Sequence, residues 1–361
     1  MTATGKHAVV IGGAGFLGRR LVALLVTEAG RHPDWPRFDS IHVFDQAAFV
    51  EDESTRQARV ASNIRLTSSR GDICSPDALR VALEGAHTVF HLASLVHVGL
   101  RRNPLIDAIN VDGTRNVVRC CQAVGVSCLV YTSSEDVVLS PNPVALGDES
   151  LPYPRHIVHD YVRTKIEGEK LVRAADAVDG LRTCSIRPVH IYGPQDPHAI
   201  TVSLEAFASG TVPFLLGEGR ARFDVVYVDN VVHAHLLAAT RLQDAATCGA
   251  VGGEAFFVGE DNAPNYFDWL RPYAQAKGVR MPRLRLPFAA VALLARLMEL
   301  VHKVTGREVP FHRFHLYILC QDFFFSNAKA ERLLGYRPLV APQEGLRRTL
   351  DWLETVPIGA E

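Results

Sequence analysis

The segment YVRTK places Tyr161 and Lys165 four residues apart, within a stretch, 158–175, whose pattern predicts a long helix. Residues four apart share one face of a helix. We therefore expect the Lys165 ammonium to stabilise a tyrosinate at Tyr161 and to lower its pKa from about 10. A tyrosine tuned in this way exchanges a proton with an alcohol as a hydride leaves or arrives. Because an ordinary amphipathic pair has the same spacing, this interpretation depends on the neighbouring motifs.

A serine hydroxyl is predicted to lie beside this pair. The apolar run CLVYT, residues 128–132, reads as a buried strand, and Ser133 and Ser134 follow it directly. Active sites of parallel sheets lie at the carboxyl ends of strands, where a hydroxyl can hydrogen-bond the reacting oxygen. We predict Ser134, Tyr161 and Lys165 as catalytic residues, with Ser133 as the alternative serine.

A glycine-rich turn, GGAGFLG, follows the first predicted strand, 7–11, and opens a predicted helix. Gly12 allows the tight turn, Gly15 lets the backbone approach a pyrophosphate, and Gly18 lets the helix pack on the strand. The helix begins with Phe16 and Leu17, and its free N–H groups and partial positive charge face the phosphates. This strand–turn–helix context predicts a dinucleotide site rather than a structural turn.

Other strand ends are expected to complete the cofactor site. Asp45 ends the second strand, where a carboxylate accepts hydrogen bonds from the adenosine ribose and repels a 2′-phosphate, so the sequence favours NAD over NADP. The alternative is a solvated aspartate at the end of the strand. Asp72 and Ile73, after the third strand, are predicted to bracket the adenine. Ala93 and Pro188 follow the fourth and sixth strands, where a small residue and a rigid turn would contact the cofactor.

Short apolar runs alternate with helical patterns along the first half of the chain. Strands are expected at 7–11, 41–44, 64–66, 88–92, 128–132 and 182–187, and helices at 16–28, 112–124 and 158–175. This alternation predicts an α/β fold with a doubly wound parallel sheet. After Pro188, turn-rich stretches, an apolar helical region at 282–306 and a polar helix at 343–355 predict a smaller C-terminal substrate lobe. We place the cofactor-binding domain with the catalytic residues at 1–187, and the lobe, interleaved with the last sheet elements, at 188–361.

Composition argues against several classes of function. Lys+Arg 38 balances Asp+Glu 39 in 361 residues, which predicts no nucleic-acid partner. The seven cysteines are odd in number and lack CxxC spacing, so neither a disulfide framework nor a zinc site is expected. His91, His190, His233 and His235 lack a cysteine or carboxylate cluster, which predicts packing roles and no metal. Reduced thiols, together with an N-terminus that does not read as a signal peptide, predict a cytoplasmic protein.

The longest apolar stretch, 286–301, is interrupted by Arg296 and Glu299. It falls short of the roughly 20 apolar residues that span a bilayer. The stretch therefore reads as a buried helix, and the alternatives are a lid over an apolar substrate or a contact with one face of a membrane.

Together these motifs resemble the extended short-chain dehydrogenases, whose glycines follow GxxGxxG spacing, and within them the 3β-hydroxysteroid dehydrogenase family. The similarity covers nearly the whole chain and includes GGAGFLG (12–18), VFD (43–45), GDI (71–73), TVFHLAS (88–94), NVDGTRNV (110–117), YTSSEDVV (131–138), DYVRTK (160–165) and RPVHIYGP (187–194). Sugar epimerases share these early segments.

Two later segments resemble steroid dehydrogenases and the related sterol-4α-carboxylate 3-dehydrogenases. They are VVYVDNVVHAHLLAA (225–239) and PFHRFHLYILCQDFFFSNAKAERLLGYRPL (310–339). Ile11 replaces the usual threonine and Thr164 the frequent serine, and neither change removes a required group.

The resemblance implies a Rossmann-fold oxidoreductase that uses NAD, with the serine, tyrosine and lysine named above as its catalytic residues and the last two also at the cofactor. It implies oxidation of a 3β-hydroxy steroid to the 3-ketone, followed in some relatives by Δ5–Δ4 isomerisation. The alternatives are decarboxylating oxidation of a sterol 4α-carboxylate, reduction of a β-ketoacid or another lipid ketone, and a nucleotide-sugar epimerase or dehydratase. The resemblance also implies a lipophilic small-molecule substrate, a homodimer and, in some relatives, peripheral membrane contact through the region 286–301.

Overall fold

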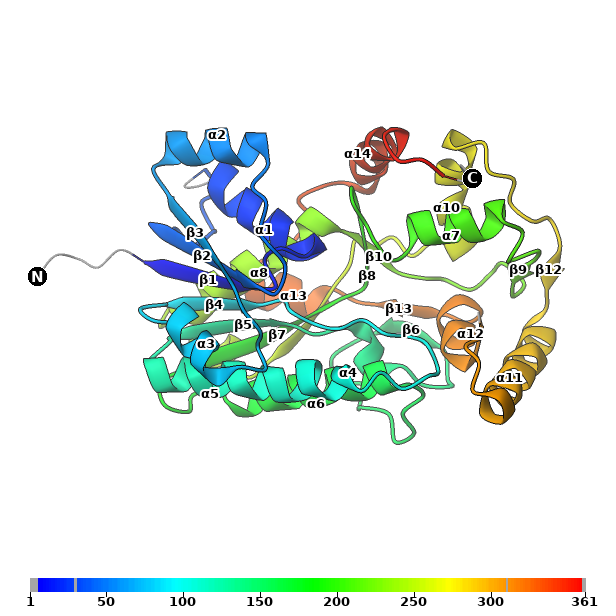
Figure 1. Cartoon of the computed structure of the whole chain (residues 1–361), viewed down its shortest axis with the longest axis horizontal. Helices are drawn as coiled ribbons and strands as arrows, with labels where there is room; N and C mark the ends of the chain where they lie inside the picture. The colour runs from blue at the N-terminus through cyan, green and yellow to red at the C-terminus, as the bar shows by residue number, and fades with distance from the viewer. Residues whose placement is uncertain (1–5, 29–30, 310, 359–361) are drawn as a thin grey trace, which may run out of the picture.

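A seven-stranded parallel sheet forms the centre of the computed structural model, which describes residues 6–28, 31–309 and 311–358 (Figure 1). Within these residues the strands are β1 (His7–Ile11), β2 (Ser40–Asp45), β3 (Arg65–Arg70), β4 (Thr88–His91), β5 (Cys128–Thr132), β7 (Arg182–Pro188) and β11 (Ala255–Val258). Their order is β11-β7-β5-β4-β1-β2-β3, and each neighbouring pair is parallel. The chain runs outward in one direction through β1, β2 and β3 and in the other through β4, β5, β7 and β11. The predicted doubly wound α/β fold is therefore confirmed.

Helices cover both faces of the sheet (Figure 1). One layer holds α1 (Phe16–Thr27), α2 (Glu53–Ser62) and α8 (Val228–Gln243), and the other holds α3 (Pro76–Ala82), α5 (Thr114–Val124) and α6 (Asp160–Ala174). Alternate residues of β1 enter opposite cores: Ala8 and Val10 pack on one side, Val9 and Ile11 on the other. Strands covered on both faces are apolar throughout, which explains the unbroken run HAVVI.

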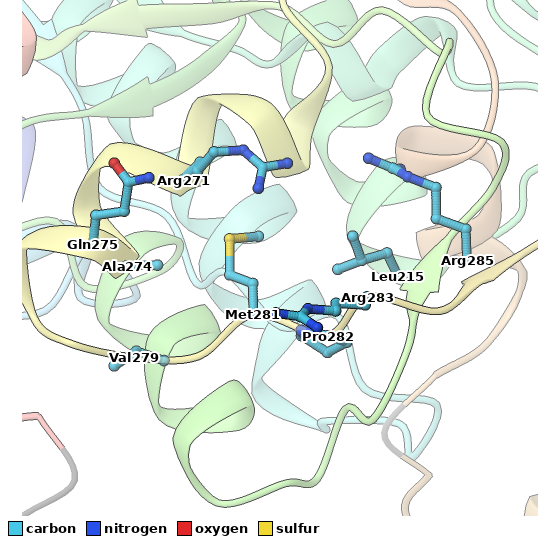
Figure 2. A pocket seen from close by; sticks show the side chains of 9 residues that line it. All are labelled: Leu215, Arg271, Ala274, Gln275, Val279, Met281, Pro282, Arg283 and Arg285. Carbon is cyan, nitrogen blue, oxygen red and sulfur yellow. The ribbon is translucent and has the colours of Figure 1, made fainter.

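The smaller lobe contains three short pairs of parallel strands and five helices among the described residues. The pairs are β6 (Val144–Gly147) with β13 (Phe323–Phe325), β8 (His190–Tyr192) with β10 (Val225–Tyr227), and β9 (Leu215–Leu216) with β12 (Arg285–Leu286). The helices are α7 (Ile200–Ala208), α10 (Tyr266–Ala276), α11 (Phe288–Thr305), α12 (Arg313–Leu319) and α14 (Pro342–Glu354). A cavity of about 360 Å³ lies in this lobe (Figure 2).

Several segments beyond residue 188 return to the main sheet. α8 packs on β5 and β7, β11 forms the seventh strand, and the short helices α9 (Cys248–Val251) and α13 (Ala328–Leu334) pack against α8. The division of the chain at residue 187 stays a prediction.

Some elements differ from their sequence-based prediction. β3 is longer than expected because it is an edge strand whose polar residues hide the apolar pattern. A short turn, α4 (Leu105–Asp107), and a π-helical turn, Ala108–Gly113, precede α5. The expectation of a buried helix near 286–301 is wrong: among the described residues of α11, only Val291 and Ala295 are buried. Apolar content alone does not tell a buried helix from one with an exposed apolar face.

No helix in the described ranges has both the length and the apolar character needed to cross a membrane.

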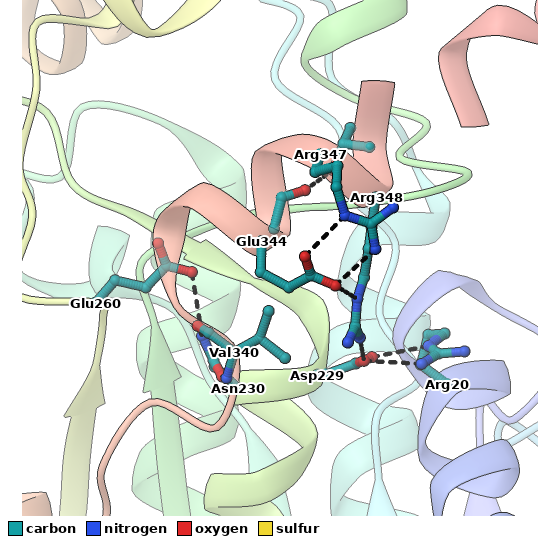
Figure 3. Close-up of polar contacts among 10 residues, drawn as sticks. Arg20, Asp229, Asn230, Glu260, Val340, Glu344, Arg347 and Arg348 are labelled. Carbon is teal, nitrogen blue, oxygen red and sulfur yellow. Dashed lines mark hydrogen bonds and ion pairs between the residues drawn. The ribbon is translucent and has the colours of Figure 1, made fainter. Parts of the chain in front are cut away.

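A chain of ion pairs joins the sheet layer to the smaller lobe (Figure 3). Arg20 on α1 donates two hydrogen bonds of 2.8 Å to the Asp229 carboxylate on α8. Arg348 on α14 lies 3.5 Å from the same carboxylate and donates to Glu344 at 2.7 Å. Because Asp229 is buried between two arginines, α14 is fixed against the helix that carries the glycine-rich turn.

A buried ion pair fixes α6 against the sheet. Arg187 on β7 donates two hydrogen bonds, of 2.9 and 2.6 Å, to the Glu169 carboxylate, which also accepts from the Tyr153 hydroxyl at 2.6 Å. Burial alone would raise the pKa of Glu169, but the Arg187 guanidinium outweighs it and holds that pKa below its usual value. Glu169 is therefore a buried carboxylate whose charge is balanced by one arginine.

Removing one partner of this pair is expected to destabilise the fold strongly. Arg187→Met should lower the free energy of unfolding by about 3–5 kcal/mol, because Glu169 would remain buried without its counter-charge. Urea denaturation followed by circular dichroism measures the change. The double variant Arg187→Met/Glu169→Leu should recover most of the loss, and a single-variant loss below about 1 kcal/mol would contradict this account.

Candidate active site

The candidate catalytic tyrosine lies in the first turn of α6, at the carboxyl edge of the sheet. His159 caps this helix, and its Nδ1 accepts the backbone N–H of Tyr161 at 3.1 Å. The helix thus begins at Asp160, two residues later than predicted. Tyr161 and Lys165 follow one turn apart and are both buried. The sequence pattern correctly placed them on one helix face.

The structure brings Ser134 to Tyr161. Ser134 follows β5, and its hydroxyl lies near enough to the Tyr161 phenol to act on the pKa of that phenol, which it lowers. The same hydroxyl donates to the Asp136 carboxylate at 3.1 Å and accepts the Asp136 backbone N–H at 3.2 Å. The alternative serine, Ser133, is tied to β7 by its backbone N–H, which donates to the Ile186 carbonyl at 2.7 Å. The contact with the phenol singles out Ser134 of the two serines.

Lys165 is held below the tyrosine by the end of β5. Its ammonium donates to the Thr132 carbonyl at 2.6 Å and lies 4.7 Å from the centre of the Tyr131 ring. Burial lowers the pKa of Lys165 to about 7, against the opposing attraction of Glu169 and Asp136. The lysine is therefore poised to change its charge near neutral pH.

The expectation that the pKa of Tyr161 lies below its usual value is wrong. Burial raises the pKa of Tyr161 above its usual value, and the nearby Asp136 carboxylate raises it further, although the Ser134 hydrogen bond works in the other direction. The spacing YxxxK does not reveal this, because the opposing carboxylate comes from another segment of the chain.

Two carboxyl groups that the sequence analysis missed lie beside Ser134. Burial raises the pKa of Asp136 to about 6, opposed by the Ser134 hydrogen bond and by Lys165. The pKa of Glu135, which is fully buried, lies well above its usual range, mainly through burial and then through Asp136. The sequence feature that could have indicated them is the pair of acidic residues directly after Ser134.

Asn110 was also missed as a positioning residue. Its amide donates to the Leu95 carbonyl at 3.0 Å and to the Thr164 hydroxyl at 3.1 Å, while its carbonyl oxygen accepts the Leu95 N–H at 2.7 Å. It thereby joins the segment after β4 to α6. Asn110 lies in the π-helical turn before α5, a local irregularity that is frequent at functional sites.

The glycine-rich turn has the shape that a dinucleotide requires. A Cβ on Gly12 would lie 2.6 Å from the backbone nitrogen of Ala93, and one on Gly18 would lie 2.2 Å from the Gly12 carbonyl oxygen. β1 and β4 are the strands between which the sheet changes direction, so Gly12 and Ala93 face each other at the switch point where such folds bind ligands. Gly15 caps α1 with backbone alone, which leaves helix N–H groups for phosphates. The residues present therefore fit NAD.

The remaining predicted cofactor residues surround this turn. Asp45 accepts the Ala14 N–H at 2.9 Å, so its carboxylate also orders the turn. The pKa of Asp72 lies below its usual value, chiefly because the carboxylate accepts the Cys74 N–H, and Ile73 packs against Gly113. Pro188 ends β7 at the same sheet edge. Phe16 and Leu17 open α1, and Phe16 lines a cavity of about 520 Å³ that continues toward α14.

The four histidines considered as metal ligands make other contacts. His91 hydrogen-bonds Thr114, His233 accepts from the Trp35 indole at 2.8 Å, and His235 hydrogen-bonds Thr132 at 2.7 Å. His190 packs against aromatic rings. Across the described part of the chain, no group of three or more histidine, cysteine or acidic side chains is arranged to hold a metal ion.

Solved structures with the same fold act on nucleotide sugars. The structure resembles a dTDP-glucose 4,6-dehydratase from Streptomyces venezuelae solved with NAD and TYD bound, with a TM-score of 0.72, 23% identity and coverage of 97% of each chain. A UDP-glucose 4-epimerase from Thermotoga maritima gives a TM-score of 0.71 at 20% identity, covering 97% of this chain and 99% of that one. At these identities the likeness establishes the fold.

Proteins related in sequence identify the family more closely than the solved structures do. Sterol-4-alpha-carboxylate 3-dehydrogenase, decarboxylating, of Saccharomyces cerevisiae is 34% identical over 351 residues, covering 96% of this chain and 97% of the yeast protein. A 3 beta-hydroxysteroid dehydrogenase/Delta 5→4-isomerase of Mycobacterium tuberculosis is 33% identical over 354 residues, covering 96% and 90%. The model of the 3-beta hydroxysteroid dehydrogenase/isomerase family matches residues 9–288. The chain therefore belongs to the 3-beta hydroxysteroid dehydrogenase/isomerase family of oxidoreductases.

Proposed function

We propose that the chain is an NAD-dependent 3β-hydroxysteroid dehydrogenase that oxidises the 3β-hydroxyl of a lipophilic steroid to the 3-ketone. The observation that carries this proposal is the buried contact between Ser134 and Tyr161 at the sheet edge that also holds the glycine-rich turn. A secondary alcohol at this position would meet one hydroxyl that orients its oxygen and, once Tyr161 has released its own proton, one phenolate that takes the proton of the alcohol. Bound NAD supplies the acceptor for the hydride.

Six of the predicted site residues have the following roles in this proposal. The backbone at Gly12, Gly15 and Gly18 would hold the pyrophosphate. Asp45 would accept the ribose hydroxyls and disfavour a 2′-phosphate. Tyr161 acts as the proton acceptor in the oxidation. Lys165, buried one turn below, compensates the negative charge of the tyrosinate before it accepts the proton.

The carboxyl groups beside Ser134 favour a substrate without its own carboxylate near the reacting carbon. A 4α-carboxylate would be adjacent to the 3-hydroxyl that Ser134 binds, and hence near Asp136, and like charges in a buried site repel strongly. The same argument disfavours a β-ketoacid. Decarboxylating oxidation is kept as the second candidate because the yeast relative is named for it. The homodimer and the cytoplasmic location stay predictions.

We also propose that α11 rests on a membrane surface. Leu293, Leu297, Leu300 and Val304 follow helical spacing along one face and are between 50% and 76% exposed. Arg296 and Lys303 lie along one side of this face. An apolar face bordered by cations is typical of a helix that lies in the interface of an anionic bilayer.

Turnover of a 3β-hydroxy steroid tests the main proposal. The protein mixed with NAD and a 3β-hydroxy-Δ5 steroid should produce NADH, followed by absorbance. Tyr161→Phe should lower kcat by about 10²- to 10⁴-fold, with NAD affinity changed only a few-fold, because only the proton acceptor is lost. A sterol 4α-carboxylate serves as the second substrate. NADH and CO₂ from that substrate alone would favour the decarboxylating alternative, and full turnover by Tyr161→Phe would refute the assigned role.

Isomerisation, if the chain performs it, is expected to depend on Asp136. In a 3-keto-Δ5 steroid, a carboxylate with a pKa near 6 can take a proton from the carbon between the ketone and the double bond and return it two carbons away. Asp136→Asn should slow conversion of a supplied 3-keto-Δ5 steroid to the conjugated enone about 100-fold or more, while hydride transfer changes less than about tenfold. Glu135→Gln is the matched control, because it changes the neighbouring buried carboxyl group while the Ser134 hydroxyl keeps its hydrogen bonds to Asp136. Equal isomerisation by Asp136→Asn and the unmodified protein would rule this role out.

Membrane contact by α11 can be measured by co-sedimentation with anionic vesicles. Leu297→Asp/Leu300→Asp should abolish sedimentation, since each change places a charge in the apolar face, whereas turnover of a water-soluble steroid should persist. Thr305→Asp adds a charge to the same helix outside that face and should retain most of the binding. Unchanged sedimentation of the double variant would show that α11 is not the contact.

A further inference from the structure

A second binding site lies in the smaller lobe, in the cavity of about 360 Å³ between α10 and the segment that leads into α11 (Figure 2). We call it the arginine pocket because Arg271, Arg283 and Arg285 line it. Its lining shares no residue with the candidate active site. The dehydrogenase mechanism proposed above leaves these arginines without a role.

The arginines reach the cavity from two directions. Arg271 projects from α10, and Arg283 and Arg285 come from the strand segment before α11; in Figure 2 the guanidinium groups of Arg271 and Arg285 point toward each other across the cavity. Among the described residues, Asp268 is the acidic side chain that pairs with them, 3.0 Å from Nη2 of Arg271 and 3.9 Å from Nη2 of Arg285. Three cations facing one carboxylate leave the pocket with a net positive charge.

The guanidinium of Arg285, a residue that lines this pocket, has one donor atom to which the other described residues offer no acceptor. Its Nη1 atom is buried and has no hydrogen-bond partner within the residues that the structure describes. The guanidinium packs over Gly219, where a Cβ would lie 2.5 Å from Nη1, so a side chain at residue 219 would displace it. A buried guanidinium N–H without an acceptor is costly unless a ligand supplies one.

We propose that the arginine pocket binds a phosphate monoester. Guanidinium groups match the oxygens of phosphate in paired hydrogen bonds, and a dianion would balance the surplus charge. The cavity falls within the range of about 300–1,000 Å³ that is typical of small-molecule sites. Leu215 and Met281 provide an apolar wall for an organic substituent, and Gln275 a neutral polar group.

Two sources could present this chemistry: a soluble organic phosphate or the phosphomonoester headgroup of a lipid. Arg283 and Arg285 immediately precede α11, and Leu284 between them is 63% exposed. The site is therefore close in sequence to the apolar face of α11. The anion site itself does not depend on steroid oxidation, so its test is independent of the proposed function.

Isothermal titration of the full chain with glycerol 3-phosphate, at fixed ionic strength, tests the site. Arg285→Gln should weaken binding about 10- to 100-fold, since hydrogen bonds to a charged ligand are lost. Arg280→Gln removes the same charge from the same segment but does not line the cavity, and it should bind as the unmodified protein does. Arg285→Lys keeps the charge and should show intermediate affinity, which separates loss of the site from loss of folding.

Vesicles distinguish the two sources. Phosphatidylcholine vesicles carrying phosphatidic acid present a phosphate monoester, and vesicles carrying phosphatidylglycerol present a diester. If the protein prefers vesicles with phosphatidic acid and Arg285→Gln removes this preference, the result supports the site with a lipid source. If the protein binds glycerol 3-phosphate but shows no preference for phosphatidic acid, the result supports the site with a soluble source. No binding of either, or equal weakening by Arg285→Gln and Arg280→Gln, would overturn the proposal.

Discussion

The bidentate ion pair between Glu169 and Arg187 is the interaction on which the candidate active site depends. It joins the middle of α6 to β7 in the protein interior, with both side chains almost fully buried. Tyr161 and Lys165 lie on the same helix, two turns and one turn before Glu169. The sheet thus determines where the phenol and the ammonium stand, and the helix has little freedom to shift because an unpaired charge would remain buried.

Burial also determines the chemistry of the site. It raises the pKa values of Tyr161, Asp136 and Glu135 and lowers that of Lys165 to about 7. All four shifts favour the neutral form of the group, as expected for a site of low polarity. Such a site stabilises a charge only where a partner lies close to it, and in the proposed mechanism Ser134 and Lys165 are the partners of the Tyr161 tyrosinate. The same low polarity suits an apolar substrate.

The smaller lobe carries two surfaces that differ from this apolar interior, the arginine pocket and the exposed face of α11. α14 is held to α1 and α8 through Asp229, so the lobe is anchored on the side of the glycine-rich turn. The cations of the arginine pocket and the apolar face of α11 lie in the same lobe. Positive charge and exposed apolar area in one lobe are compatible with a surface that receives a lipophilic substrate.

The sequence by itself determined the fold class, the glycine-rich turn and the family, and it pointed to Ser134, Tyr161 and Lys165 as the candidate catalytic residues. These features depend on local patterns: apolar runs alternating with helical segments, glycines at fixed spacing, and a tyrosine and lysine one helical turn apart. Only the tertiary structure decided the surroundings of these groups. Asp136 comes from the segment after β5 and Tyr161 from α6, so the sign of the tyrosine's pKa shift depends on a contact across the fold. Likewise, Asn110 joins two distant segments, and α11 exposes an apolar face rather than burying it. Arg271 and Arg285 face each other across a cavity. Packing between distant segments decides these features, because it determines which side chains lose contact with water and which charges become neighbours.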